Sequence, residues 1–158
     1  VEFGNTLWIG EQRDGLIVDW ELRKDRSPGD TKLFRLSLER IKGVFGRYPD
    51  SAAGDRGLWS KDNETWLEHE GVYSALCPRG VDELTERMKE PRFVELQTRR
   101  SQTEGRIGIV KNNFLGRPLS SKCFVLRELA VTWAVLAHNL WSLAGMRRTE
   151  EKEKRQAA

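Results

Sequence analysis

An Asp-Gly dipeptide at residues 14–15 limits the possible folds more than any other part of the sequence. It lies between two apolar runs, residues 3–9 and 16–22. An Asp-Gly pair in that position favours a tight hairpin, because Asp and Gly both tolerate a positive φ. In the second run apolar residues recur at every second position, which predicts one apolar face: Leu16, Val18, Trp20 and Leu22. A chain that opens with an antiparallel hairpin does not form a purely parallel sheet.

Turn residues divide the rest of the chain into alternating helical and extended stretches. Asp30 is a helix-capping residue, and the apolar spacing after it predicts a helix that ends near Gly43 or Gly46. The remaining pattern predicts short strands at 51–53 and 72–76. It predicts helices at 61–70, with Ser60 as the cap, at 81–90 and at 92–112, with Pro91 separating the last two. Strands that alternate with helices and begin with a hairpin predict an α/β domain with a mixed sheet.

The last helix has the clearest pattern. Apolar residues recur at intervals of three and four from Leu126 to Ala144. We interpret this stripe as core packing rather than as a dimer zipper, because it is wider than a strict heptad seam. Residues 147–158 are mostly charged and predict a flexible tail. The sequence therefore predicts one domain over 1–146 followed by a tail over 147–158.

Length and cysteine content narrow the class of protein. The chain has 158 residues, about one domain. Its two cysteines, Cys77 and Cys123, are far apart, which supports neither a disulfide framework nor a structural zinc site. We find no apolar run near the ~18 residues of a membrane span and no signal peptide. These features predict a cytoplasmic protein without a membrane partner.

The distribution of charge is more informative than its sum. The net charge is only +3, from 27 basic and 24 acidic residues. Between Gln97 and Arg127, however, seven basic residues stand against one acid, Glu104, so this segment carries a charge of +6. A polyanion-binding surface needs such a segment, because each phosphate contact releases counterions. The alternative is a solvated helix face, and charge alone does not decide between the two.

One stripe of the helix over 92–112 combines an acid with two bases. Arg100, Glu104 and Lys111 are separated by four and seven residues, and these intervals place them on one face of a helix. By themselves they are consistent with an ordinary surface ion pair. Gly105 and Gly108, however, each weaken a helix by about 1 kcal/mol relative to alanine. A glycine beside an acid also lets another backbone approach closely, as at a binding site.

Asp55 is the second acid of interest. It follows a short buried strand, and open α/β sheets bind ligands at the carboxyl ends of their strands. Its alternative role is a turn residue that accepts hydrogen bonds from local amides. Two carboxylates held by a sheet edge and a facing helix can bind Mg²⁺. Two such ions ~4 Å apart activate an attacking oxygen and stabilise the leaving oxygen of a phosphodiester.

These residues resemble the C-terminal catalytic portion of bacterial insertion-sequence transposases of the DDE type. That family carries two aspartates and a glutamate on a ribonuclease-H-like core, and its last block reads Y-(2)-R-(3)-E-(6)-K. Arg100, Glu104 and Lys111 reproduce the R-(3)-E-(6)-K part, whereas Gln97 stands at the tyrosine position. Residues 54–58 resemble the block of the second aspartate, and the resemblance extends from the hairpin to about residue 143.

The resemblance implies a fold, a site and a function. It implies a ribonuclease-H-like mixed sheet flanked by helices, in a chain that cuts and joins DNA strands by metal-dependent phosphodiester chemistry. The implied catalytic residues and ligands of Mg²⁺ or Mn²⁺ are Asp55 and Glu104, and the implied DNA-binding residues are Arg99, Arg100, Arg106 and Lys111. The implied partners are the transposon ends, the target DNA and further copies of the chain.

The first aspartate of the family has no counterpart here. Asp14 lies in the hairpin turn and Asp19 lies on the following strand, and neither matches the motif. We therefore expect the first strand and its aspartate upstream of Val1, and we expect this fragment to be inactive alone. The alternatives are a catalytically inactive transposase remnant and a general nucleic-acid-binding domain.

Overall fold

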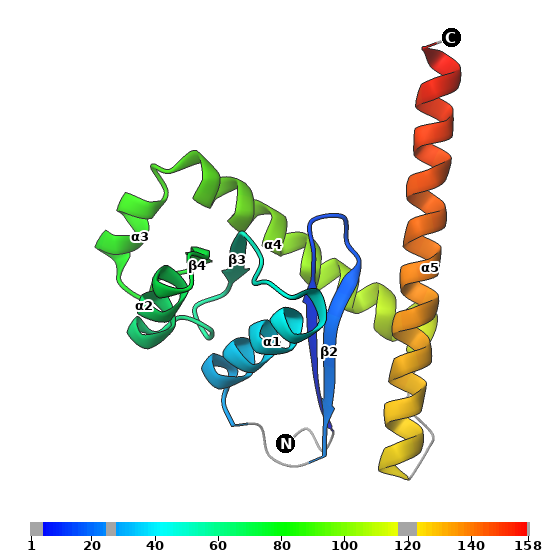
Figure 1. Cartoon of the computed structure of the whole chain (residues 1–158), viewed down its shortest axis with the longest axis horizontal. Helices are drawn as coiled ribbons and strands as arrows, with labels where there is room; N and C mark the ends of the chain where they lie inside the picture. Colours follow the sequence, from blue (N-terminus) through cyan, green and yellow to red (C-terminus); the bar gives the residue numbers. More distant parts are fainter. Residues whose placement is uncertain (1–4, 25–27, 117–122, 158) are drawn as a thin grey trace.

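The computed structural model describes residues 5–24, 28–116 and 123–157. It is 62% helical. The elements (Figure 1) are, in chain order, β1 (Thr6–Glu11), β2 (Ile17–Arg23), α1 (Asp30–Phe45), β3 (Ser51–Gly54), α2 (Lys61–His69), β4 (Tyr73–Leu76), α3 (Val81–Arg87), α4 (Pro91–Ile109), the π-helical η1 (Val110–Leu115) and α5 (Phe124–Gln156).

Figure 1 shows how α4 connects the two sides of the molecule. It runs from α3, beside α2 and the pair β3–β4, past the hairpin β1–β2, and leads through η1 to α5. The C-terminal part of α5 extends beyond the rest of the protein. The hairpin lies between α1 and α5.

The predicted fold class is wrong. Within the described ranges there is no five-stranded mixed sheet of the ribonuclease-H type, with or without its first strand, but two separate sheets of two strands. β1 pairs with β2 antiparallel, and β3 pairs with β4 parallel, from Ser51 opposite Tyr73 to Gly54 opposite Leu76. The order of strands and helices along a chain does not fix which strand edges pair. Here the sheets meet through side chains, since Trp8 of β1 packs on the core beside β3 and β4.

Two hydrophobic cores hold these parts together. The first lies between α1, α2 and the pair β3–β4, and its buried residues are Phe34, Leu38, Ala52, Leu67, Val72 and Leu76. The second joins β2, η1 and α5 through Ile17, Leu22, Val110, Val131 and Val135. Burying a side chain of this size stabilises the fold by about 1.5–3 kcal/mol. Asn139 adds a polar contact, because it accepts from the Ile17 amide at 2.9 Å and donates to the Ile17 carbonyl at 2.8 Å.

Several local predictions are confirmed. The Asp-Gly turn joins the two strands of the hairpin, with Gly15 at φ 79°. Ser60 caps α2 by accepting from the Asn63 amide at 3.1 Å. Pro91 lies in the first turn of α4, where its missing N–H costs no helical hydrogen bond. The predicted tail is different: residues 147–156 are helical and continue α5 instead of forming a separate segment after the domain.

The predicted core face of α5 is wrong. The stripe that includes Leu126, Trp133 and Leu140 is exposed, and the buried residues are Val131, Ala134, Val135, His138 and Ser142. The helix is apolar on both sides, so periodicity alone could not show which side meets the protein. By length and composition alone α5 is also a candidate membrane span, a test that core helices of soluble proteins pass as well.

Candidate functional site

Gln97 attaches α4 to the carboxyl ends of β3 and β4. Its Nε2 donates to the carbonyl oxygen of Gly54 at 3.0 Å and to that of Ala75. Gly54 ends β3, and a Cβ there would lie 2.6 Å from Leu58 Cδ1 and 2.8 Å from Leu76 Cδ2, so a larger residue would require these leucine side chains to shift. This attachment brings the next two turns of α4 close to the loop that follows β3.

A cavity of about 390 Å³ lies where these segments meet. Its lining combines residues after β3, after β4 and on α4: Asp55, Arg56, Gly57, Cys77, Arg100 and Glu104. The structure thus brings together three residues that the sequence analysis selected, Asp55, Arg100 and Glu104, from segments that are remote along the chain.

Asp55 is oriented by its own loop. Its Oδ1 accepts hydrogen bonds from the amides of Gly57 at 2.9 Å and Leu58 at 3.2 Å. This is the local turn role that the sequence left open as an alternative. The second oxygen, Oδ2, accepts no hydrogen bond from the described residues, and the side chain is exposed. Asp55 therefore combines a fixed position with one carboxylate oxygen available to a ligand.

Glu104 has more freedom. Its side chain is 76% exposed, and Oε1 lies 3.5 Å from Nη1 of Arg100, one helical turn earlier. An exposed pair at this spacing contributes only about 0.3–0.5 kcal/mol. The Arg100 contact therefore does not prevent Glu104 from binding a cation in the cavity.

The donor types at the cavity are those that a hydrated divalent ion takes, not those of a closed protein cage. No group of three or more His, Cys, Asp or Glu side chains that could hold a metal lies in residues 5–24, 28–116 and 123–157. Mg²⁺ retains several waters and takes one or two protein carboxylates together with substrate phosphates. Asp55 and Glu104 supply donors of that kind, and Mn²⁺ accepts the same oxygen ligands.

The opposite face of α4 holds the hairpin. Nη2 of Arg99 donates to the carbonyl of Gln12 at 3.2 Å. Nε of Arg106 lies 3.4 Å from Oε2 of the buried Glu11 carboxylate. A Cβ at Gly15 would come within 2.3 Å of the Arg106 guanidinium, so the turn glycine leaves room for it. Arg99 and Arg106, selected from the sequence as DNA-binding residues, thus both make contacts within the protein.

The other basic residues of this segment are dispersed. Lys111 is the second residue of η1, about 10 Å along the helix axis from Glu104, and does not line the cavity. Arg127 donates to Oδ1 of Asn5 at 2.9 Å. Arg117 and Lys122 lie outside the described residues. Of the four predicted DNA-binding residues, Arg100 alone borders the cavity.

No role in the cavity was predicted for Arg56 and Cys77, which line it, and none in positioning α4 for Gln97. Arg56 lies in the block 54–58 and Gln97 at the tyrosine position, so Cys77 alone of these three lies outside the motifs selected from the sequence. A signal for Cys77 was present. It follows Leu76, the last residue of β4, as Asp55 follows Gly54, the last residue of β3. Because the carboxyl ends of paired parallel strands meet at one edge, these two residues were candidates for a common site.

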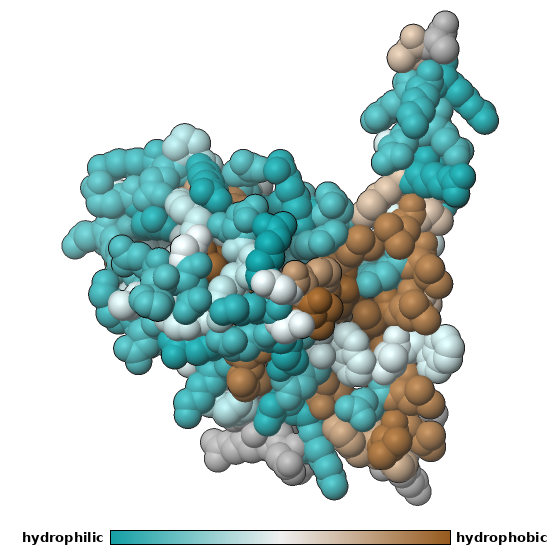
Figure 2. All heavy atoms as spheres, viewed as in Figure 1, coloured by the Kyte–Doolittle hydropathy of each residue, from teal (hydrophilic) through white to brown (hydrophobic). Residues whose placement is uncertain are grey.

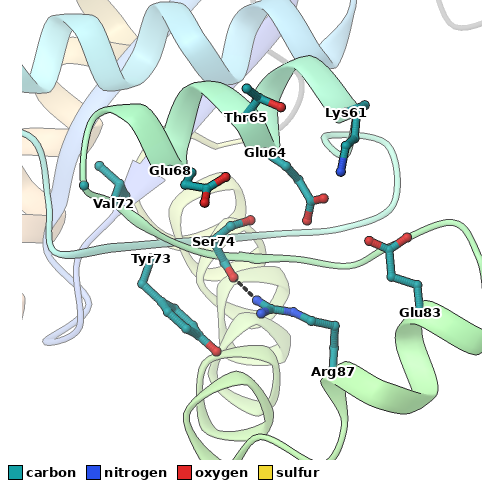
Figure 3. Close-up of a pocket in the computed structure, with 10 residues that line it drawn as sticks. Lys61, Glu64, Thr65, Glu68, Val72, Tyr73, Ser74, Glu83 and Arg87 are labelled. Carbon is teal, nitrogen blue, oxygen red and sulfur yellow. Dashed lines mark hydrogen bonds between the residues drawn. The ribbon is translucent and has the colours of Figure 1, made fainter.

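A second, larger cavity of about 530 Å³ lies between α2, β4 and α3 (Figure 3). Glu64, Glu68 and Glu83 share it with Lys61 and Arg87, and Arg87 donates to the carbonyl of Ser74. Because acids and bases alternate around this space and Arg87 is also paired with Glu90 at 3.0 Å, we assign no function to it.

No known protein family, curated protein or solved structure matches this chain. The functional assignment therefore depends on the site itself. Its two independent elements are the spacing of Arg100, Glu104 and Lys111 in the sequence and the meeting of Asp55 with Glu104 at one cavity.

Proposed function

We propose that this chain contributes part of the catalytic site of a DDE transposase, which cuts and joins DNA strands by metal-dependent phosphodiester chemistry. One observation supports this more than any other. Asp55 and Glu104 line the same cavity, and Arg100, which precedes Glu104 at the spacing of the transposase block, lines it with them.

Asp55 and Glu104 would hold Mg²⁺ or Mn²⁺ at this site. When bound, the ion supplies activation of the attacking oxygen and stabilisation of the leaving oxygen of a phosphodiester. Arg56 and Arg100 place positive charge beside the carboxylates, where they attract a DNA phosphate. Lys111 would contact the DNA backbone further along the same stripe of the helix.

Metal binding tests this proposal directly. Calorimetric titration of the whole chain with Mn²⁺ is expected to show one site, and Asp55→Asn and Glu104→Gln should each weaken it at least tenfold, or ~1.4 kcal/mol. Asp82→Asn is the matched control, because Asp82 is an exposed acid on α3 outside the cavity. Equal losses in all three variants would show diffuse binding to surface acids and would contradict the proposal.

A general nucleic-acid-binding domain is the second candidate, favoured by the basic segment from Gln97 to Arg127. The two candidate functions predict different effects of Mn²⁺ on DNA binding. A transposase site should bind DNA more tightly when Mn²⁺ is present, and Asp55→Asn should abolish that gain. A simple binding domain should bind equally well with and without Mn²⁺, and Asp55→Asn should change nothing.

A further inference from the structure

The long helix α5 has an apolar face that the rest of the protein does not cover. Its six large apolar side chains have exposed fractions between 45% for Leu136 and 62% for Trp133. They are Leu126, Leu129, Trp133, Leu136, Leu140 and Leu143, which we call the α5 seam. Figure 2 shows the apolar surface along α5 and the hydrophilic surface of its C-terminal end.

The α5 seam has the spacing of a coiled coil. Successive members are separated by three, four, three, four and three residues, the period of 3.5 that two packed helices share. The seam is also distinct from the buried side of α5: Trp133 is two residues from the buried Val131, about 200° around the helix. One side of α5 thus packs on β2 and η1, and the other presents a complete heptad pattern to solvent.

We propose that the α5 seam is the interface with a second copy of this chain, with the two α5 helices packed antiparallel. A heptad seam fits a helix of the same period, and α5 itself supplies one. The intervals of the seam read the same in both directions, so a two-fold axis between residues 134 and 135 closes the interface on itself. It places Leu126 opposite Leu143, Leu129 opposite Leu140, and Trp133 opposite Leu136 of the other copy.

Charge favours the antiparallel over the parallel arrangement. Beyond Leu143 the same heptad positions are occupied by Arg147, Glu150 and Lys154. In a parallel pair each would face its own counterpart, and like charges across an interface are unfavourable. In an antiparallel pair these segments point in opposite directions and remain in water.

The size of the surface is suited to a dimer. Six side chains that are each about half exposed present roughly 600 Å² of apolar surface, at the upper end of the largest patch on an ordinary monomer. A standard interface buries about 800 Å² on each partner, and the seam together with the exposed Val125, Ala137 and Ala144 supplies most of that area. No Asp, Glu, Lys or Arg interrupts residues 129–146. The surface therefore supports self-association independently of the proposed transposase function.

Sedimentation velocity of the whole chain at micromolar concentration tests the interface. The unmodified protein is expected to sediment as a dimer, and Trp133→Glu, beside the two-fold axis, should weaken the dimer at least tenfold. Val44→Glu is the matched control, since Val44 is 75% exposed on α1 away from the seam, and it should leave the dimer intact. A monomeric unmodified protein, or a dimer that Trp133→Glu does not weaken, would overturn the proposal.

Cross-linking tests the orientation and does not require a charged variant to fold. In a Cys77→Ser, Cys123→Ser background, Leu126→Cys and Leu143→Cys are prepared as separate proteins. Mixed and exposed to a mild oxidant, they should give a disulfide-linked dimer in which each chain carries one substitution. Leu126→Cys alone should give none, and a linked dimer from it would show a parallel pair and overturn the arrangement.

Binding to lipid vesicles tests whether the α5 seam contacts a membrane instead of a second copy of the chain. The unmodified chain should stay in solution with neutral phosphatidylcholine vesicles, because its seam is covered by the second copy. Flotation with the vesicles as a monomer, lost in Trp133→Glu, would show that the seam meets a membrane and would overturn the proposal.

Discussion

In two regions of this protein an aspartate lies near arginine side chains. The two carboxylates differ in burial and in how many of their oxygens accept hydrogen bonds. Between β2 and α1, the buried Asp19 accepts from Ser37 at 2.6 Å and from Nε and Nη2 of Arg40 at 2.7 Å each. At the end of β3, the exposed Asp55 accepts two backbone amides on one oxygen and leaves the other free of described partners.

This contrast separates a structural acid from a candidate functional one. A buried carboxylate is stable only when its lone pairs are satisfied, and the two-pronged contact with Arg40 does this for Asp19. The same contact raises the pKa of Arg40 above its ordinary value. No oxygen of Asp19 is left for a ligand. At Asp55 the loop holds the carboxylate in place without occupying it fully, which is what a metal ligand requires.

The largest expected effect compares the same substitution in the two regions. Asp19→Asn should lower the free energy of unfolding by about 3 kcal/mol, because a buried neutral amide cannot accept all three hydrogen bonds that Ser37 and Arg40 donate, and Arg40 keeps only Glu21 as a counter-charge. Asp55→Asn should lower it by less than about 0.5 kcal/mol, because an exposed Asn accepts the same two amides. Urea denaturation measures both. Similar losses of stability in the two variants would contradict the distinction between a structural aspartate at 19 and a candidate functional one at 55.

Some local features near both regions were predictable, because the signals that determine them lie within a few residues. The Asp14-Gly15 turn, the cap at Ser60 and the stripe shared by Arg100 and Glu104 are all of this kind. The burial of Asp19 was not predictable, since the alternation in that strand puts Asp19 opposite the predicted apolar face. The approach of Glu104 to Asp55 was expected from a strand end that faces a helix, and the transposase resemblance implied the same pair of residues. In the structure both residues line one cavity, although the sheet expected to bring them together is not present in the described residues.

Contacts between distant segments were not predictable. Nothing near Arg106 in the sequence indicates that it pairs with Glu11, and that pair shows why a count of basic residues overstated the charge available to DNA. The predicted strand pairing was wrong for the same reason, because local sequence patterns define strands but not which strands pair. On α5, Val131 and Trp133 are both apolar, and only the packed structure shows which one is buried.

Gln97 is expected to have the next largest effect, because it connects the strand ends to α4. Gln97→Ala leaves two carbonyl groups without their shared donor and should cost about 1–2 kcal/mol of stability. It should also weaken Mn²⁺ binding, since Glu104 is then less well held near Asp55. Gln102→Ala, an exposed glutamine on the same helix, is the control and should affect neither. Loss of stability with unchanged Mn²⁺ affinity would show that Gln97 supports the fold but not the site.

The smallest expected effect is on DNA affinity, and it compares basic residues on the two sides of α4. Arg99 and Arg106 contact the hairpin, whereas Arg100 borders the cavity and Lys111 lies beyond α4, in η1 and outside the cavity lining. Lys111→Ala should weaken binding to all DNA sequences alike and reduce the salt dependence by about one phosphate contact, a slope change of ~0.9.

Lys154→Ala is the matched comparison, because it removes the same charge from an exposed part of α5 that also carries acids. If net charge alone governed binding, the two variants would lose affinity equally. A specific contact between Lys111 and DNA instead requires that Lys111→Ala cost more at every salt concentration and flatten the salt dependence, with Lys154→Ala close to the unmodified chain. Filter binding across a salt series measures both quantities. Equal losses would mean that DNA is attracted diffusely, and the stripe of Arg100, Glu104 and Lys111 would then have no part in binding it.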